Sequence, residues 1–459
     1  MKKSCVCVFS LLILFLSFTI EAKNLDDWLN VQEKISLSKI QENISPEDAK
    51  PGVVIASPST QKPDYYYHWV RDAALAMDVF NYTSASKDLL LEFATFSRQN
   101  QIDSGFLGLG EPKYYVHGRP YDLPWGRPQN DGPALRALTL IRFANTLLEQ
   151  GDTETVRKHL YVGAFPATKV IKVDLEFTGN YWSQPCFDLW EERWGHHFYT
   201  RMVQRRALLE GSRLAEKLDD PEAATWYFKE ASKIEKDLLR FQSIDKEVLL
   251  PTLNGENGND FRETKLDTSI LLAVLHSYNF QDRFYSASNE WILSTTSQLE
   301  AAFEKTYPIN DRAVPGILIG RYPEDEYYGG NPWFLTTLAM AEIYYRAILE
   351  FIQDEKIEIT ALNQKFFNRL IQRYGDQTKL KIGETFTFQE DKFHEILNLM
   401  RWKADNFLRV IQLYTKPSGA MSEQISKQDG RQISANDLTW SYAAFLTAKW
   451  LREEVLAYF

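Results

Sequence analysis

The sequence predicts a predominantly α-helical protein whose helices pair into antiparallel hairpins arranged in a ring. Three observations support this fold class. Apolar residues recur at helical spacing along most of the chain, strand-like alternation is rare, and long connections roughly alternate with short ones. In a ring of hairpins, this alternation places the long connections at one end, where they can build a single pocket.

Thirteen segments carry the helical spacing. Their approximate ranges are 25–42, 69–82, 86–101, 131–150, 166–181, 196–217, 220–242, 266–275, 286–305, 331–353, 357–373, 389–414 and 435–455. The sequence Asp131-Gly132-Pro133 predicts the start of one helix, because Asp is a favoured cap and Pro a favoured first residue. A double ring of hairpins uses twelve helices, so one segment is expected to lie outside it.

The connections predict where a functional site forms. The long ones are 43–68, 102–130, 182–195, 243–265, 306–330 and 415–434. The clearest strand signal is the alternation over 379–388, which predicts a small β-hairpin around Ile382-Gly383. No Pro- or Ser-rich linker interrupts the chain, which favours one domain.

The amino terminus predicts an exported protein. Two lysines, an apolar run over 5–20 and the pair Glu21-Ala22 are typical of a secretory signal peptide over residues 1–22. The run is shorter than the about 20 residues of a membrane span, so no span is expected after signal removal. The mature chain, 23–459, is expected to be a single, monomeric domain that is secreted or periplasmic.

Composition and net charge limit the kinds of partner and ligand that the protein can bind. The net charge of −10 argues against nucleic acid, since phosphate binding needs a basic face, and favours a neutral partner. Of three cysteines only Cys186 lies outside the signal, and it is expected to pack as a small apolar residue. The seven histidines lack metal-ligand spacing, so neither a metal nor a cofactor is expected.

The long connections are rich in Trp, Tyr, Arg and carboxylates. These segments are 63–72, 125–131, 188–192, 321–333 and 419–424. The tryptophans in or beside the connections are Trp69, Trp125, Trp182, Trp190, Trp194 and Trp333. Aromatic faces rimmed by charged groups suit a sugar, because a pyranose ring has an apolar C–H face and a belt of hydroxyls.

Glycosidic bond cleavage requires a carboxylic acid that protonates the leaving oxygen and a second carboxylate that activates water or attacks. Glu191 and Glu192 are candidates for the acid, and Glu423 is the candidate partner. Adjacent side chains point in different directions, so at most one of Glu191 and Glu192 can be the acid.

These segments resemble the sequence blocks of the glucoamylase family, family 15 of the glycoside hydrolases. Five blocks match in order between about 50 and 450: 65–72, 125–136, 190–192, 321–333 and 422–424. The resemblance implies an (α/α)6 barrel and exo-acting removal of glucose from the non-reducing ends of α-1,4-glucans such as starch and glycogen. It also implies inversion at the anomeric carbon. No starch-binding module is expected beside the single catalytic domain over 23–459.

Carried over residue by residue, the resemblance makes Glu191 the general acid and Glu423 the general base. Tyr65 and Gln424 would place the attacking water, and Asp325 would orient Arg321. The remaining implied substrate-binding residues are Trp69, Arg71, Asp72, Trp125, Leu189, Trp190, Glu192, Arg321 and Trp333. Inversion requires the two catalytic carboxyl groups to lie roughly 6.5–9.5 Å apart. A protonated acid also predicts an acidic pH optimum.

Two alternatives stay open at this point. One is another family member with different acceptor-side loops, such as a trehalase or an enzyme acting on isomaltose or dextran. The other is a carbohydrate-binding helical protein without turnover, against which the intact Glu191 and Glu423 pair argues.

Overall fold

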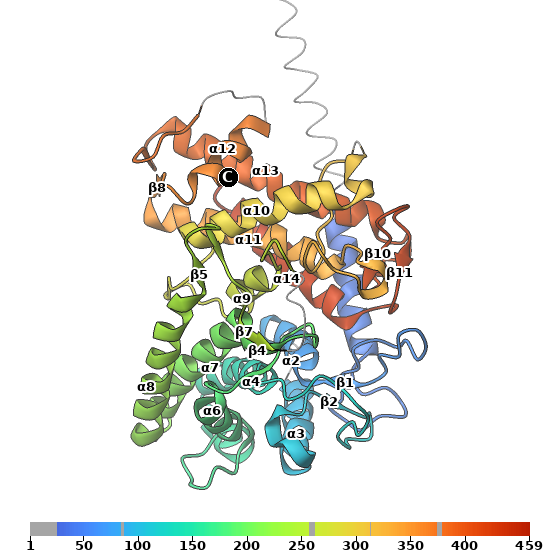
Figure 1. Ribbon diagram of the computed structural model, residues 1–459. Helices are drawn as coiled ribbons and strands as arrows, with labels where there is room; N and C mark the ends of the chain where they lie inside the picture. The colour runs from blue at the N-terminus through green and yellow to red at the C-terminus, as the bar shows by residue number, and fades with distance from the viewer. Residues whose placement is uncertain (1–24, 84–86, 257–261, 313, 374–378) are drawn as a thin grey trace, which may run out of the picture.

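The computed structural model describes residues 25–459 except 84–86, 257–261, 313 and 374–378. Six of its helices form a closed inner ring in which each contacts the next and the last contacts the first. In ring order they are α2 (Val70–Asp78), α4 (Gly132–Glu149), α7 (Phe198–Lys217), α9 (Ser269–His276), α11 (Phe334–Asp354) and α14 (Thr439–Leu456) (Figure 1). This ring is the framework of the molecule.

A second set of helices covers the ring from outside. Its members are the helix over 25–42, α3 (Lys87–Ile102), α6 (Val170–Tyr181), α8 (Pro221–Leu238), α10 (Glu290–Thr306) and α13 (Asp391–Tyr414). α3 and α6 pack on α4, α8 on α7, α10 on α9 and α13 on α11. The helix over 25–42 meets α14, where Trp28 contacts Phe445 edge to face. The double ring confirms the predicted (α/α)6 fold.

The one predicted helix that does not belong to the double ring is the segment predicted over 357–373. It is α12 (Gln364–Arg373), which packs on α10 and α13. The predicted range began too early, because strand β8 (Lys356–Glu358) and a turn occupy the residues before α12.

The β-hairpin predicted over 379–388 is half wrong. Only Thr385–Thr387 forms a strand, β9, and its partner is the distant β8 rather than 379–382. Ile382 and Gly383 do form a turn, as expected, and Gly383 has the positive φ that such turns require. A local pattern indicated the strand, but tertiary packing chose its partner.

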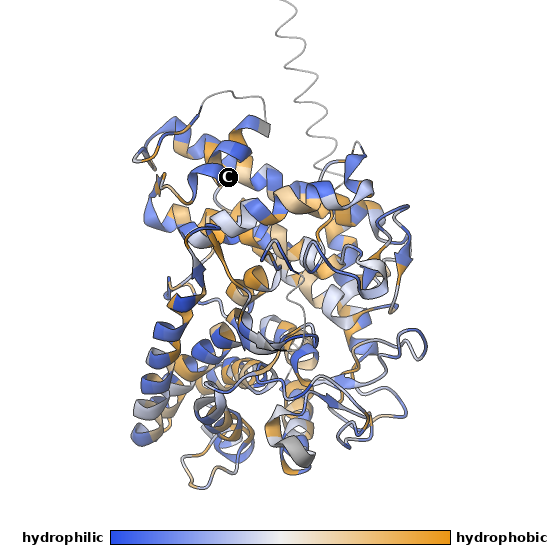
Figure 2. Cartoon of the chain, in the orientation of Figure 1, coloured by the Kyte–Doolittle hydropathy of each residue, from blue (hydrophilic) through white to orange (hydrophobic). Residues whose placement is uncertain are grey.

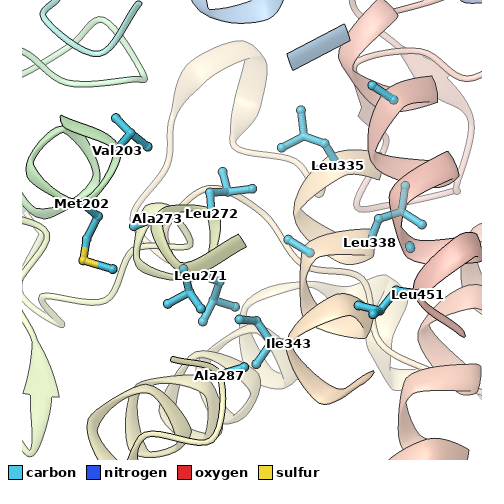
Figure 3. Packing of buried hydrophobic residues seen from close by; sticks show 14 of the residues in the cluster. Met202, Val203, Leu271, Leu272, Ala273, Ala287, Leu335, Leu338, Ile343 and Leu451 are labelled. Carbon is cyan, nitrogen blue, oxygen red and sulfur yellow. The ribbon is translucent and has the colours of Figure 1, made fainter. Parts of the chain in front are cut away.

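Hydrophobicity explains which helices lie inside. α9 is short and almost wholly apolar, and its residues from Ser269 to Val274 are buried, whereas α8 carries polar residues outward (Figure 2). Where α9 meets its neighbours, Leu271, Ala287 and Ile343 lie close together, whereas Leu272 points to the other side of α9 (Figure 3). Cys186 is buried and free among the described residues, as expected for a packing residue.

All six inner helices begin at the same end of the ring, and each follows one of the six long connections. This end of the ring therefore receives six helix amino termini, whose partial positive charge favours nearby carboxylates. The six long connections lie where the sequence predicted them, but the return connections are not all short, because 150–169 and 355–390 contain short elements of their own.

Short elements complete the connections. The strands are β1 (His68–Trp69), β2 (Lys113–Tyr114), β3 (Cys186–Phe187), β4 (Trp194–His197), β5 (Gln242–Ser243), β6 (Val248–Leu249), β7 (Thr252–Glu256), β10 (Gln424–Ile425) and β11 (Gln432–Ile433). They pair antiparallel as β1 with β2, β3 with β4, β4 with β7, β5 with β6 and β10 with β11.

Short helical turns make up the remaining secondary structure. They are η1 (Val79–Tyr82), η2 (Gly105–Gly110), α5 (Thr153–Thr155), η3 (Val156–Leu160), η4 (Leu239–Phe241), η5 (Pro308–Asp311) and η6 (Tyr327–Gly329). In the described part of the chain, no helix combines the length and apolar character of a membrane span. The predicted signal peptide over 1–22 lies outside the described residues.

Replacing Leu271 by Ala tests the inner ring. Leu271 is fully buried, so the change is expected to lower the free energy of unfolding by about 2–5 kcal/mol through lost contacts and a residual cavity. Leu239→Ala is the matched control, because 52% of Leu239 is exposed and its loss is expected to cost under about 0.5 kcal/mol. Urea denaturation followed by circular dichroism measures both, and equal losses would contradict this description of the ring.

Candidate active site

A cavity of about 260 Å³ lies at the end of the ring where the inner helices begin. The residues that line it are Ala56, Tyr65, Trp69, Arg71, Asp72, Trp125, Gly126, Leu189, Trp190, Glu191, Glu192, Arg321, Tyr327, Trp333, Glu423, Leu438 and Trp440. Five of the six long connections and the adjoining first turns of inner helices contribute to this lining. Seven of these seventeen residues are aromatic and six are charged, with charges of both signs.

Glu191 and Glu423 line this one cavity although 232 positions separate them in the sequence. Glu191 sits in a tight turn with a positive φ of 66°. Asp188 closes the turn, because its carbonyl accepts the N–H of Glu191 and its carboxylate accepts those of Glu192 and Arg193. Left-handed backbone at a non-glycine residue costs energy and is concentrated at functional sites.

The hydrogen bonds of Glu191 converge on one carboxyl oxygen. Trp69 Nε1 and Gln129 Nε2 donate to Oε1 at 2.8 and 2.9 Å, and Arg71 Nη2 lies 3.5 Å from the same atom. Within the described chain, Oε2 makes no hydrogen bond. Because Oε1 accepts two N–H groups, a proton on Glu191 belongs on Oε2. That placement suits an acid that donates its proton into the cavity.

Glu423 is almost fully buried, with 1% of the residue exposed. Burial disfavours the charged form and raises the pKa of Glu423 to about 7. Hydrogen bonds from Ser434 and from Gln424 Nε2 at 3.1 Å oppose this shift, since they stabilise the carboxylate. Gln424 itself lies behind the cavity wall and reaches the site through Glu423.

Arg71 forms the centre of a second cluster at the start of α2. Its guanidinium lies 3.3 Å from Asp72, 3.4 Å from Asp131 and 3.5 Å from Glu191, and it donates to Gln129 at 2.9 Å. Burial raises the pKa of Asp72 to about 6. Asp131 does stand at the amino-terminal cap of α4, but its side chain makes no capping hydrogen bond and pairs with Arg71 instead.

Arg321 and Glu192 form a salt bridge of 2.7 Å on another side of the cavity. Asp325 holds Arg321 through two hydrogen bonds of 2.6 and 2.8 Å, in the supporting position expected for it outside the cavity lining. Tyr322 donates to the other oxygen of Glu192 at 2.6 Å, and burial raises the pKa of Glu192. This part of the wall is therefore held rigidly by charge-assisted hydrogen bonds.

The connection before α9 contributes support rather than lining. Arg262 forms a 2.6 Å ion pair with Asp267 and also reaches Glu192 at 3.2 Å. Asp267 accepts the indole N–H of Trp190 at 2.9 Å. Sequence reasoning missed both residues, because they lie in no aromatic segment.

Twelve of the fourteen predicted site residues line the cavity, and the other two, Asp325 and Gln424, bond to residues that do. Two of the six tryptophans of the connections lie elsewhere: Trp182 bonds to Glu230, and Trp194 packs on Phe187.

Sequence reasoning also left several lining residues unassigned. Trp440 was missed because it lies inside α14, although the first turn of an inner helix also supplies Arg71. Tyr327 lies in one of the quoted segments, and its hydroxyl hydrogen bonds to that of Tyr65 at 2.7 Å. Position relative to the inner-helix starts is the signal that would have found Trp440.

Two carboxyl groups and an aromatic wall facing one cavity are what hydrolysis of a glycosidic bond requires, so the fold and site suit a glycoside hydrolase. The model of glycosyl hydrolases family 15 matches residues 30–450. The chain therefore belongs to this family, as the sequence blocks implied.

Curated relatives and solved structures agree with this assignment. The chain is 38% identical to a glucoamylase of Blastobotrys adeninivorans, covering 94% of this chain and 73% of the relative. It is 35% identical to a probable glucoamylase of Schizosaccharomyces pombe, covering 94% and 93%. The structure of a family 15 glucoamylase from Hypocrea jecorina superposes with a TM-score of 0.86 at 32% identity, covering 94% of this chain and 73% of that one.

Replacing Ser434 by Ala tests the electrostatics of Glu423. The hydroxyl of Ser434 lowers the pKa of Glu423, so its loss is expected to raise that pKa by about one unit. If Glu423 is the base, the acid limb of the kcat/KM profile then moves by the same amount to higher pH. Ser232→Ala, on the exposed face of α8, is the control and should leave the profile unchanged.

An unshifted acid limb in Ser434→Ala would mean that another group controls it. The acidic pH optimum expected from the sequence was derived from the need for a protonated acid alone, without the pKa of the base. A base with a pKa of about 7 moves the expected optimum of the free enzyme toward neutral pH.

Proposed function

We infer that this family 15 hydrolase is a glucoamylase, an inverting, exo-acting α-glucosidase. It releases β-D-glucose from the non-reducing ends of α-1,4-glucans and malto-oligosaccharides. The observation that carries this inference is the placement of Glu191 and Glu423 on one cavity that Arg71, Asp72 and aromatic rings enclose. Relatives 31–38% identical over most of the chain bear the name glucoamylase, which supports it.

In the proposed mechanism, Glu191 donates a proton from Oε2 to the glycosidic oxygen. Glu423, as the ionised base, removes a proton from a water that attacks the anomeric carbon from the opposite face. Gln424 and Ser434 orient the carboxylate of Glu423, while Tyr65 helps to place the water. Glucose leaves in the β configuration because the attack and the departure are on opposite faces.

The terminal glucose is held by two kinds of contact. Arg71 offers a buried cation and Asp72 a partly buried carboxylate to its hydroxyls, a charge-assisted arrangement that is stronger than bonds between neutral groups. Trp69, Trp125 and Trp333 present apolar surface to the C–H faces of the sugars. Glu192 and Arg321 hold the region of the scissile bond and the next sugar.

The natural setting follows from the amino-terminal segment. We propose that residues 1–22 are removed as a signal peptide and that the single domain over 23–459 acts as a secreted or periplasmic monomer on starch, glycogen or their oligosaccharides. An intracellular glucoamylase of Saccharomyces cerevisiae is also among the relatives. Detection of the mature amino terminus near Lys23 in the exported fraction tests this.

Proton NMR of the first sugar released from maltoheptaose tests the reaction. β-Glucose without larger products is expected, because exo action releases one glucose from a chain end and inversion yields the β anomer. The α anomer would contradict inversion, and maltose or longer products would contradict exo action. Preferential cleavage of trehalose or isomaltose over maltose would assign the chain to another activity within the family.

Replacing Glu423 by Gln tests the base. Hydrolysis is expected to fall by at least about 10³-fold while maltose binding survives, as isothermal calorimetry can measure. The pKa of Glu423 is raised from 4.5 to about 7 in the fold, so its ionised form destabilises the fold at higher pH. The Tm of Glu423→Gln should therefore exceed that of the wild type at pH 8, with the difference shrinking toward pH 4.5. Full retained activity would remove Glu423 from the mechanism.

A further inference from the structure

Lys113 is a buried cation that none of the proposed catalytic roles uses. Only 2% of the residue is exposed. It lies on β2, directly opposite Trp69 of β1 in the antiparallel ladder. The carbonyl of Lys113 also accepts the N–H of Tyr121 at 2.9 Å, so the backbone ties the lysine to two of the aromatic residues around it.

Four aromatic rings enclose the ammonium group of Lys113. Its Nζ lies 3.8 Å from the ring centroid of Trp125, 4.0 Å from those of Tyr67 and Tyr121, and 4.4 Å from that of Trp69. A cation within about 6 Å of one ring face already counts as a cation–π contact. The ammonium group of Lys113 makes four such contacts at once.

The four rings also contact one another in a closed circuit. Trp69 meets Trp125 at 5.9 Å between centroids, Trp125 meets Tyr121 at 5.7 Å, Tyr121 meets Tyr67 at 5.3 Å and Tyr67 meets Trp69 at 6.0 Å. All four pairs are edge to face, which is a favourable ring geometry. The circuit leaves the ring faces turned toward the cation.

This aromatic cage, formed by Tyr67, Trp69, Tyr121 and Trp125, is joined to the proposed acid by one hydrogen bond. Trp69 and Trp125 line the catalytic cavity, whereas Tyr67 and Tyr121 do not. The indole N–H of Trp69 donates to Oε1 of Glu191 at 2.8 Å. Any rotation of Trp69 therefore moves a donor that fixes the orientation of the Glu191 carboxyl group.

We propose that Lys113 is a positioning residue of the active site. Its caged ammonium group fixes the planes of Trp69 and Trp125, and through Trp69 it fixes the carboxyl group of Glu191. The charged groups near the ammonium are Glu191, Asp64 and Arg127. This inference rests on the proposed hydrolytic function, because its consequence is a defect in proton donation.

The first test replaces Lys113 by Met, which keeps the length of the side chain but removes the charge. We expect kcat on both maltose and maltoheptaose to fall by about tenfold to a hundredfold, since a small displacement of an acid has effects of this order. KM should change less than kcat. Lys113→Arg should recover part of the lost kcat, because a guanidinium also makes cation–π contacts.

Lys449→Met is the matched control. Lys449 is another buried lysine, but it forms ion pairs with Glu33 and Glu453. It lies in the second half of α14, whereas the start of α14 lines the cavity. Its replacement is expected to lower Tm without changing kcat per folded enzyme. A fall in kcat of the same size in both variants would show a general effect of losing a buried charge and would overturn the proposal.

A double-mutant cycle tests the route through Trp69. Trp69→Phe removes the N–H that Glu191 accepts, so adding Lys113→Met to Trp69→Phe should cause little further loss of kcat. Losses that multiply, or an unchanged kcat in Lys113→Met, would overturn the proposal. Near-ultraviolet circular dichroism should also lose amplitude in Lys113→Met while the far-ultraviolet spectrum stays constant.

Tyr121→Leu keeps the proposal testable if Lys113→Met does not fold. Tyr121 is partly exposed and outside the cavity lining, so its loss weakens the cage without removing a lining group. A severalfold fall in kcat is expected, and wild-type kcat would overturn the proposal. Failure of the proposed function itself is recognised separately, because the wild type would then release no β-glucose.

Discussion

The closed ring of six inner helices is the constraint on which the rest of the structure depends. Because every inner helix begins at the same end, each long connection must arrive there before its helix starts. Arg71 and Trp440, in the first turns of two inner helices, consequently face the same cavity as the connections themselves. Residues from distant parts of the chain meet there because the helix starts converge, and short ladders such as β1–β2 and β10–β11 align some of them locally.

Charge is the second requirement, because the site buries several carboxylates together. Arg71, Arg321 and Arg262 each contact more than one carboxylate, so each of these three arginines balances several negative charges. Helix amino termini at this end add favourable potential for anions. Glu423 is the exception, since hydrogen bonds rather than an ion pair support it and its pKa is raised. A group with such a pKa is suited to exchange protons.

Local patterns were most reliable where one strong signal decided the structure. Helical periodicity located every segment of the double ring, because amphipathic helices carry their burial pattern in their own sequence. The pairing of Lys356–Glu358 with Thr385–Thr387 was not foreseeable, because α12 lies between the two strands and strand partners are chosen by packing. Asp131 illustrates the same point at the site: its cap position was predicted, but its side chain serves Arg71 instead.

The sequence by itself determined the helical segments, the alternation of connection lengths and the concentration of aromatic and charged residues in the connections. The tertiary structure alone decided which oxygen of Glu191 accepts hydrogen bonds and how deeply Glu423 is buried. It also decided that Lys113 lies inside a cage of four rings. Periodicity and composition depend on near neighbours in the chain. Orientation, burial and cation–π geometry instead depend on atoms that come together only when the ring has closed.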